Sequence, residues 1–200
     1  MKTLPLATFT APAILLSSCS TSTNPSPTNS GADWHDFVGS TYNGLSSSSS
    51  LGPTSIPVLG SPSYEANWGK PKVRKSAAGI YELNYANPNQ PFDRLVIFGS
   101  PKPFPALKSP PFFSKDEMVN GELTAVDYPQ SFRTTTIAGK SVRWFQESGS
   151  GGADGAYYST VGFSVTDSSG KTGYYRLVVE GGDNMDAEVA RRFSSVTPAN

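Results

Sequence analysis

The chain has 200 residues and a formal net charge of zero, with 16 basic and 16 acidic side chains. This balance argues against a nucleic-acid partner, because such proteins present a basic field to the phosphates. The only cysteine is Cys19 and the only histidine is His35. These counts exclude a disulfide framework and leave no Cys–His or Ser–His nucleophile pair in the predicted domain.

The first 18 residues have the pattern of a secretory signal peptide. Lys2 is the only charged side chain before Asp33, and it precedes a run of about a dozen mostly apolar residues. A transmembrane helix needs about 20 such residues, so this run is too short to be a permanent span. We expect residues 1–18 to be removed from the mature protein.

The apolar run ends in Leu16, Ser17, Ser18 and Cys19. This tetrapeptide resembles the lipobox of bacterial lipoprotein precursors. The resemblance implies that the Cys19 thiol takes a diacylglyceryl group, that the chain is cut just before it, and that the new amine is acylated by a fatty acid such as palmitate. Two or three acyl chains anchor a protein firmly, since each buried CH₂ contributes about 0.8 kcal/mol.

Ser20 follows the lipobox cysteine. A serine at this place resembles the outer-membrane sorting pattern of enteric bacteria, so we expect the protein in the bacterial cell envelope, anchored by lipid at the outer membrane. An ordinary cleaved signal peptide with an incidental cysteine is the alternative.

Residues 19–63 are rich in Ser, Thr, Pro and Gly and include an unbroken serine run at 46–50. Such a segment buries too little apolar surface to offset the entropy lost when it becomes ordered, so a flexible tether is predicted. As a random coil the tether would reach roughly 35–40 Å and would hold the domain clear of the membrane.

An aromatic island around Trp34 and Phe37 interrupts this tether. The two rings either dock on the protein's own domain or form a short motif that anchors a partner. The second hypothesis makes Trp34 and Phe37 candidate partner-binding residues. The single imidazole of His35, between Asp33 and Asp36, is a poor ligand set, so no metal is expected.

Residues 64–200 are predicted to form a single α+β domain, with an antiparallel sheet of about six strands and a C-terminal helix packed across it. A basic run at 70–75 opens the domain and is interpreted as a solvated edge, with contact to anionic lipid or envelope polysaccharide as the alternative. Apolar alternation and turn signals place the strands at 79–85, 95–98, 132–137, 142–145, 156–165 and 172–180.

Two helices are predicted. A capping box at 114–117 predicts a short middle helix that ends at Gly121. An apolar stripe at spacing three and four predicts the C-terminal helix at 185–193, with Arg191 and Arg192 in its last turn. The order of strand 174–180, acidic turn and terminal helix resembles the end of the Mog1/PsbP-like sandwiches, which implies a helix packed on the sheet.

Five prolines between residues 100 and 113 favour an extended path, and phenylalanines lie between them. One interpretation is a loop strapped across the sheet with its aromatic rings in the core. The other is an exposed binding loop, which makes Phe104 and Phe112 candidate partner-binding residues.

The sequence contains neither a Gly-x-Ser-x-Gly elbow nor a Walker phosphate loop. Two carboxylates that face one cleft could still act as they do in glycosidases. The carboxylates on or near predicted strands are Glu82, Asp93, Glu147, Asp154 and Glu180.

From these features we expect a lipid-anchored envelope protein with a non-enzymatic binding or adaptor domain and no cofactor. Its expected contacts are the membrane, through the lipid on Cys19, and an envelope protein or polysaccharide. Two alternatives remain open: a lipid-anchored hydrolase of cell-wall glycan that uses paired carboxylates, and a carrier of a small apolar ligand held between sheet and helix.

Overall fold

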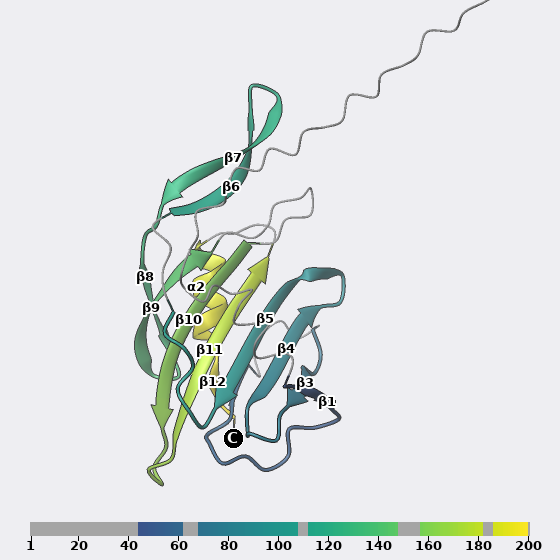
Figure 1. Cartoon of the computed structure of the whole chain (residues 1–200), viewed down its shortest axis with the longest axis vertical. Coiled ribbons are helices and arrows are strands. Elements are labelled where there is room, and N and C mark those ends of the chain that lie inside the picture. The colour runs from purple at the N-terminus through teal and green to yellow at the C-terminus, as the bar shows by residue number, and fades with distance from the viewer. Residues whose placement is uncertain (1–43, 62–67, 108–111, 148–156, 182–185, 200) are drawn as a thin grey trace, which may run out of the picture.

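An eight-stranded antiparallel sheet dominates the computed structural model, which describes residues 44–61, 68–107, 112–147, 157–181 and 186–199 (Figure 1). The strand order is β1-β3-β4-β5-β11-β10-β9-β8. The strands are β1 (Ser46–Ser48), β3 (Lys72–Lys75), β4 (Tyr81–Asn87), β5 (Gln90–Ser100), β8 (Arg133–Ile137), β9 (Lys140–Glu147), β10 (Tyr157–Thr166) and β11 (Thr172–Gly181).

Two small antiparallel pairs and one helix complete the described fold. The pairs are β2 (Leu59–Gly60) with β12 (Thr197–Pro198), and β6 (Phe112–Val119) with β7 (Glu122–Pro129). The helix is α2 (Asp186–Ser194). The predicted antiparallel sheet with a C-terminal helix is confirmed, although the fold is mostly β and the sheet has eight strands where about six were expected.

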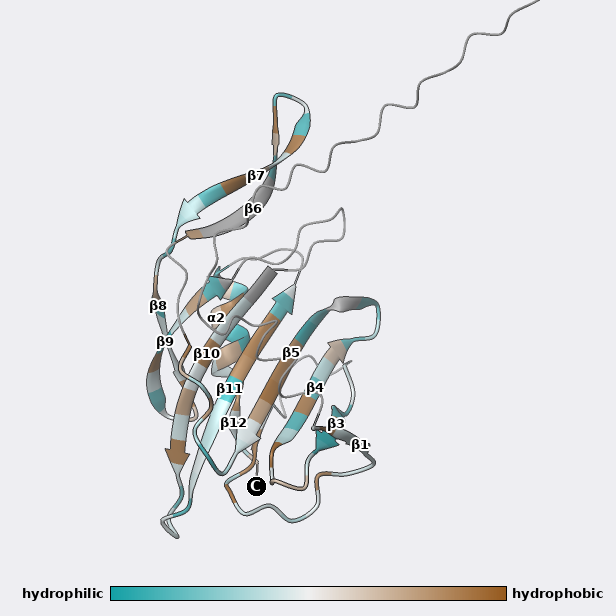
Figure 2. Ribbon diagram, viewed as in Figure 1, coloured by the Kyte–Doolittle hydropathy of each residue, from teal (hydrophilic) through white to brown (hydrophobic). Residues whose placement is uncertain are grey.

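The centre of the sheet is formed by β5 and β11, which lie far apart in the sequence. Ile97 of β5 pairs with Leu177 of β11, and both side chains are fully buried. Val96 and Val178, which point to the opposite face, are also buried. Because both faces are covered here, residues 95–98 of β5 and 177–179 of β11 are uninterrupted apolar runs (Figure 2).

Helix α2 covers one face of the sheet. Val189 and Phe193 are buried against it, and the Phe193 ring meets the Trp144 ring edge-on with centroids 5.6 Å apart. Burial of each of these aliphatic and aromatic side chains contributes about 1.5–3 kcal/mol. In the described part of the chain, no helix is long and apolar enough to cross a bilayer.

The other face, called here the second face, has a smaller apolar cluster. Leu45, Val96, Phe98 and Val178 are buried in it, and the half-buried Phe104 packs against them. Phe104 belongs to residues 101–107, which follow β5 and are called here the proline loop. The interpretation of this loop as a strap across the sheet is therefore correct for Phe104.

The predicted tether is wrong for residues 44–61, which belong to the folded domain. Ser46–Ser48 form β1 and pair with β3. Leu45, Ile56 and Leu59 are buried. The serine run forms a strand because ladder hydrogen bonds come from the backbone, and the three apolar residues supply the burial that the serines lack.

Two tyrosine hydroxyls fix the same segment to the sheet. Tyr81 accepts a hydrogen bond from the Leu59 amide at 3.1 Å, and Tyr175 donates one to the Pro57 carbonyl. Burial raises the pKa of Tyr81 to about 12, so this hydroxyl stays protonated under ordinary conditions. The contacts make residues 57–59 part of the core rather than of a linker.

The predicted middle helix at 114–117 is also wrong, because these residues lie within β6 of the β6–β7 hairpin. The hairpin turns at Asn120 and Gly121, whose φ angles are 53° and 86°. Positive φ at both turn residues is the requirement of a type I′ turn, for which Asn-Gly is the preferred pair. The turn chemistry thus overrides the local capping signal.

Candidate functional site

Of the five predicted site residues, Cys19, Trp34 and Phe37 lie outside the described residues, and their roles remain predictions. Phe104 and Phe112 are described, and the structure gives them different settings. Phe104 is half-buried on the second face, whereas Phe112 is 54% exposed at the start of β6. The proposed shared binding loop is therefore divided between a groove and a separate hairpin.

The proline loop forms one wall of a groove on the second face, with a volume of about 390 Å³. The other wall and the floor come from β10 and β11. The lining residues are Pro103, Phe104, Pro105, Ala106, Leu107, Gly162, Phe163, Ser164, Tyr174, Tyr175 and Arg176. None of these described residues is a carboxylate, a histidine or a cysteine.

Arg176 holds the loop in place. Its guanidinium donates a hydrogen bond to the Pro105 carbonyl and lies 5.7 Å from the centroid of the Phe104 ring. Arg176 itself is 2% exposed. A buried cation beside an aromatic face and a carbonyl fixes the position of that ring, so the groove is built on a rigid strand rather than on a loose loop.

The strand β10 contributes backbone as well as side chains to the groove. Gly162, Phe163 and Ser164 are consecutive, and successive side chains of a strand point to opposite faces. All three line the groove, so it contacts the backbone of β10 as well as its side chains. The described ladder between β9 and β10 covers only residues 158–160, and beyond it the Lys140 side chain donates a hydrogen bond to the Ser164 carbonyl at 2.6 Å.

Gly162 lines the groove and, because it has no side chain, leaves space between β10 and the proline loop. It is exposed, and a Cβ added at this position would lie 3.4 Å from Leu107 Cδ1. A larger side chain would therefore push against the proline loop. The groove combines aromatic surface, a guanidinium and the backbone of β10, which suits the binding of an extended chain but supplies no acid or base.

The candidate catalytic carboxylates are engaged elsewhere. Glu82 lies 3.6 Å from Arg74, its neighbour across β3 and β4. Glu180 forms an ion pair with Arg94, its neighbour across β5 and β11. Asp93 forms an ion pair with Arg192 of α2. The Glu147 side chain and Asp154 lie outside the described residues.

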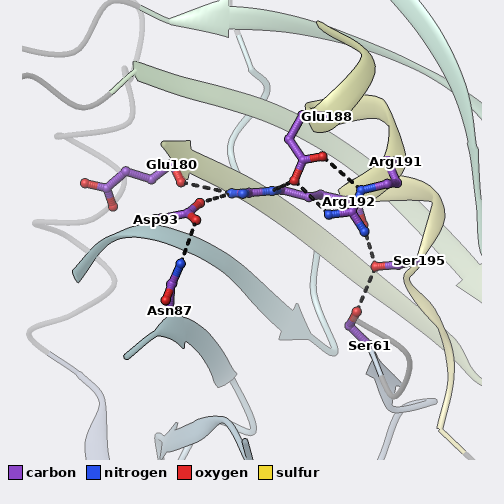
Figure 3. A network of polar contacts seen from close by, with 8 residues as sticks. All are labelled: Ser61, Asn87, Asp93, Glu180, Glu188, Arg191, Arg192 and Ser195. Carbon is purple, nitrogen blue, oxygen red and sulfur yellow. Dashed lines mark hydrogen bonds and ion pairs between the residues drawn. The ribbon is translucent and has the colours of Figure 1, made fainter. Parts of the chain in front are cut away.

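A polar cluster joins α2 to the sheet (Figure 3). Arg192 forms an ion pair with Asp93, donates to Glu188 at 2.8 Å, and donates to the Glu180 carbonyl at 3.4 Å. Asn87 donates to the other carboxylate oxygen of Asp93. Each charged group faces an opposite charge, so this cluster ties elements together and offers no unpaired acid or base.

Glu188 lies on the outer side of the cluster. The hydrogen bond from Arg191, with further help from Arg192, lowers the pKa of the Glu188 carboxyl from its usual value of 4.5 to about 2. A lowered pKa means that stability from this carboxylate is present above its unfolded pKa and is lost as the pH falls towards 2. The group therefore stays ionised and is unsuited to act as a general acid.

Two of the most informative residues were not identified from the sequence. Arg192 was interpreted only as a cation that favours the helix end, yet it is 7% exposed. It shares the apolar spacing of Val189, Phe193 and Val196, which is the signal that indicates an inward position. Arg176 lies in β11, which is buried on both faces, and its period-two position predicts only a face, not the proline loop above it.

Comparison with known proteins gives no family for this chain: no family model, no curated protein and no solved structure matches it. The resemblances to bacterial lipoprotein precursors and to Mog1/PsbP-like sandwiches therefore remain predictions from the sequence.

Proposed function

We propose that the protein is a lipid-anchored, non-enzymatic binding module of the bacterial envelope, whose groove takes an extended segment of an envelope protein or polysaccharide. The observation that supports this proposal best is the lining of the groove. Phe104 and Tyr174 supply aromatic surface, Arg176 fixes one wall, and β10 offers backbone. Flat rings pack on sugar faces and apolar side chains, and a strand edge pairs with an extended backbone.

The lipid anchor is the second part of the proposal. Cys19, as the lipobox cysteine, holds the protein at the membrane, and residues between it and the folded domain act as the link. Residues 44–61 belong to the folded domain, so fewer residues separate the groove from the lipid than the predicted tether of 19–63 implies. The partner must accordingly lie close to the anchored surface.

The two alternatives receive less support. A hydrolase needs two available carboxylates on opposite sides of a sugar, whereas Glu82, Asp93 and Glu180 each face an arginine. A carrier needs a space between sheet and helix. Trp144 and Phe193 meet there at 5.6 Å, and both are at most 1% exposed.

Photo-crosslinking in intact cells tests the groove. A photoreactive residue in place of Phe104 should give one dominant adduct, because this position lines the groove. Thr134 on β8 is the matched control, since it is exposed and does not line the groove. The adduct at 104 should disappear when Cys19→Ala removes the anchor.

Three results would contradict the proposal. Equal labelling at positions 104 and 134 would mean that the groove is not the contact surface. An adduct at 104 that persists in the Cys19→Ala protein would separate partner binding from the anchor. Release of soluble fragments from purified cell-wall glycan, abolished by Glu82→Gln or Glu180→Gln alone, would support the hydrolase instead.

A further inference from the structure

The β6–β7 hairpin, residues 112–129 and called here the arm, forms a sheet of its own. Figure 1 shows it projecting past the end of the large sheet, beside β8 and β9. An isolated two-stranded hairpin is marginally stable in water and needs a further packing surface. The arm therefore has the features of a hairpin that packs against another molecule.

The tip of the arm is apolar and exposed. Met118 is 68% exposed, Leu123 is 59% exposed and Val119 is 40% exposed. Met118 and Leu123 are direct cross-strand partners, so their side chains lie on the same face. Large apolar residues gathered at the end of a projecting ribbon indicate a docking surface rather than scattered surface apolarity.

The charge of the arm restricts what it can dock on. Its sequence has four acidic residues, Asp116, Glu117, Glu122 and Asp127, against one basic residue, Lys115. This net charge of −3 is repelled by anionic lipid and by acidic polysaccharide. The complementary surface must carry basic groups around an apolar contact.

The same molecule presents such a surface at the far edge of the large sheet. Lys70, Lys72 and Lys75 are exposed there, with the half-buried Val73 between them, and these residues are called here the basic edge. Only the three-residue strand β1 lies beyond β3. In the sheet order β3 and β8 lie at opposite ends, and the arm extends from the β8 end (Figure 1). The arm therefore cannot reach the basic edge of its own chain.

We propose that the arm of one copy docks on the basic edge of a second copy of this chain. The contact joins two different surfaces, so it is heterologous and repeats around a ring or along a row of copies. Each copy gives one arm and receives another. This contact involves neither the groove nor its partner.

Substitutions that reverse the charge of each surface test this contact. The arm variant carries Glu122→Lys and Asp127→Lys, and the edge variant carries Lys70→Glu and Lys72→Glu, each in the full chain with Cys19→Ala to keep it free of lipid. In sedimentation velocity at low salt the parent chain should associate as its concentration rises, and salt near 0.5 M should weaken that association, since the contact is electrostatic at its rim.

Each variant alone should be monomeric where the parent associates, with affinity reduced at least about tenfold. In the arm variant both surfaces are basic, and in the edge variant both are acidic. Mixing the two variants pairs a basic arm with an acidic edge and an acidic arm with a basic edge. Association should therefore return only in the mixture.

The apolar tip needs its own variant. Met118→Ser with Leu123→Ser should also abolish association while the melting temperature stays within a few degrees, because both side chains are already exposed in one copy. A parent chain that stays monomeric at low salt would overturn the proposal. So would association that survives both charge variants, or a mixture that fails to associate while each variant remains folded.

Discussion

Arg191 and Arg192 are adjacent in α2 but differ in their surroundings. The Arg191 side chain is 50% exposed and contacts Glu188 alone among the ion pairs described, whereas the Arg192 side chain is 8% exposed and pairs with both Asp93 and Glu188. The guanidinium of Arg192 also lies 5.2 Å from the centroid of the Trp68 ring. The two neighbours thus provide a matched comparison of a surface ion pair with a buried one.

We expect Arg192→Ala to lower the free energy of unfolding by about 3–5 kcal/mol, because it leaves Asp93, whose side chain is only 14% exposed, without its cation. Arg191→Ala should cost less than about 1 kcal/mol, as is usual for an exposed pair. Urea denaturation followed by circular dichroism measures both values. Similar losses for the two variants would mean that the Asp93–Arg192 pair does not join α2 to the sheet as described.

The sequence allows some of these residue roles to be predicted and not others. The period-two pattern of β4 correctly predicts that Tyr81, Leu83 and Tyr85 share one face, and all three are buried. The contact between Arg192 and Asp93 joins residues on different elements, and no local pattern specifies it. The groove at Phe104 is of the same kind, because it requires the proline loop and β10 to meet.

At the scale of elements, the segment 44–61 has the greatest effect on where the domain begins. Its buried side chains are Leu45, Ile56 and Leu59, and Tyr81 and Tyr175 bond to its backbone. A chain that starts at residue 44 should therefore fold, whereas one that starts at residue 64, at the predicted boundary, should not.

Near-ultraviolet circular dichroism and thermal melting of the two truncated chains measure this difference. Removal of three buried aliphatic side chains costs about 2–5 kcal/mol each, which together approaches the whole stability of a domain of this size. A cooperative melting transition in the chain that starts at 64 would show that 44–61 is dispensable.

The wrong prediction for the arm has a clear physical cause. A Ser-x-x-Glu capping box at 114–117 is a signal for only the first turn of a helix. Gly121, at which the predicted helix ends, instead adopts with Asn120 the positive φ angles of a hairpin turn. The residues on either side of this turn form two strands of equal length. The pattern of two strands around an Asn-Gly turn therefore predicts the structure better than the capping box does.

At the scale of the whole molecule, the pairing of β5 with β11, called here the seam, determines whether the sheet unfolds cooperatively. Along the sheet, β1, β3, β4 and β5 lie on one side of this seam, and β8 to β11 lie on the other. The pairing at the seam joins Leu95–Val179 and Ile97–Leu177, all at most 3% exposed. Such long-range pairing cannot be read from local patterns, which is why six of the eight strands of the large sheet were predictable and their order was not.

Hydrogen exchange should reflect this arrangement. At concentrations where the chain is monomeric, amides of β5 and β11 should exchange slowest, and amides of β6 and β7 should exchange at least roughly 100-fold faster, which corresponds to about 2.7 kcal/mol. Mass spectrometry of peptides from the two regions measures the ratio. Equal protection would contradict the description of the arm as a weakly supported ribbon.

The pairing of β2 with β12 has a consequence for how the protein is made. Thr197 and Pro198, near the C-terminus, lie against Leu59 and Gly60, and the fully buried Val196 accepts a hydrogen bond from the Ala138 amide. Leu59 and Gly60 thus have no strand partner until residues 197 and 198 have been synthesised. A chain that stops before these residues exposes the apolar segment around Leu59 to chaperones and proteases, and the segment becomes protected once the β2–β12 pair has formed.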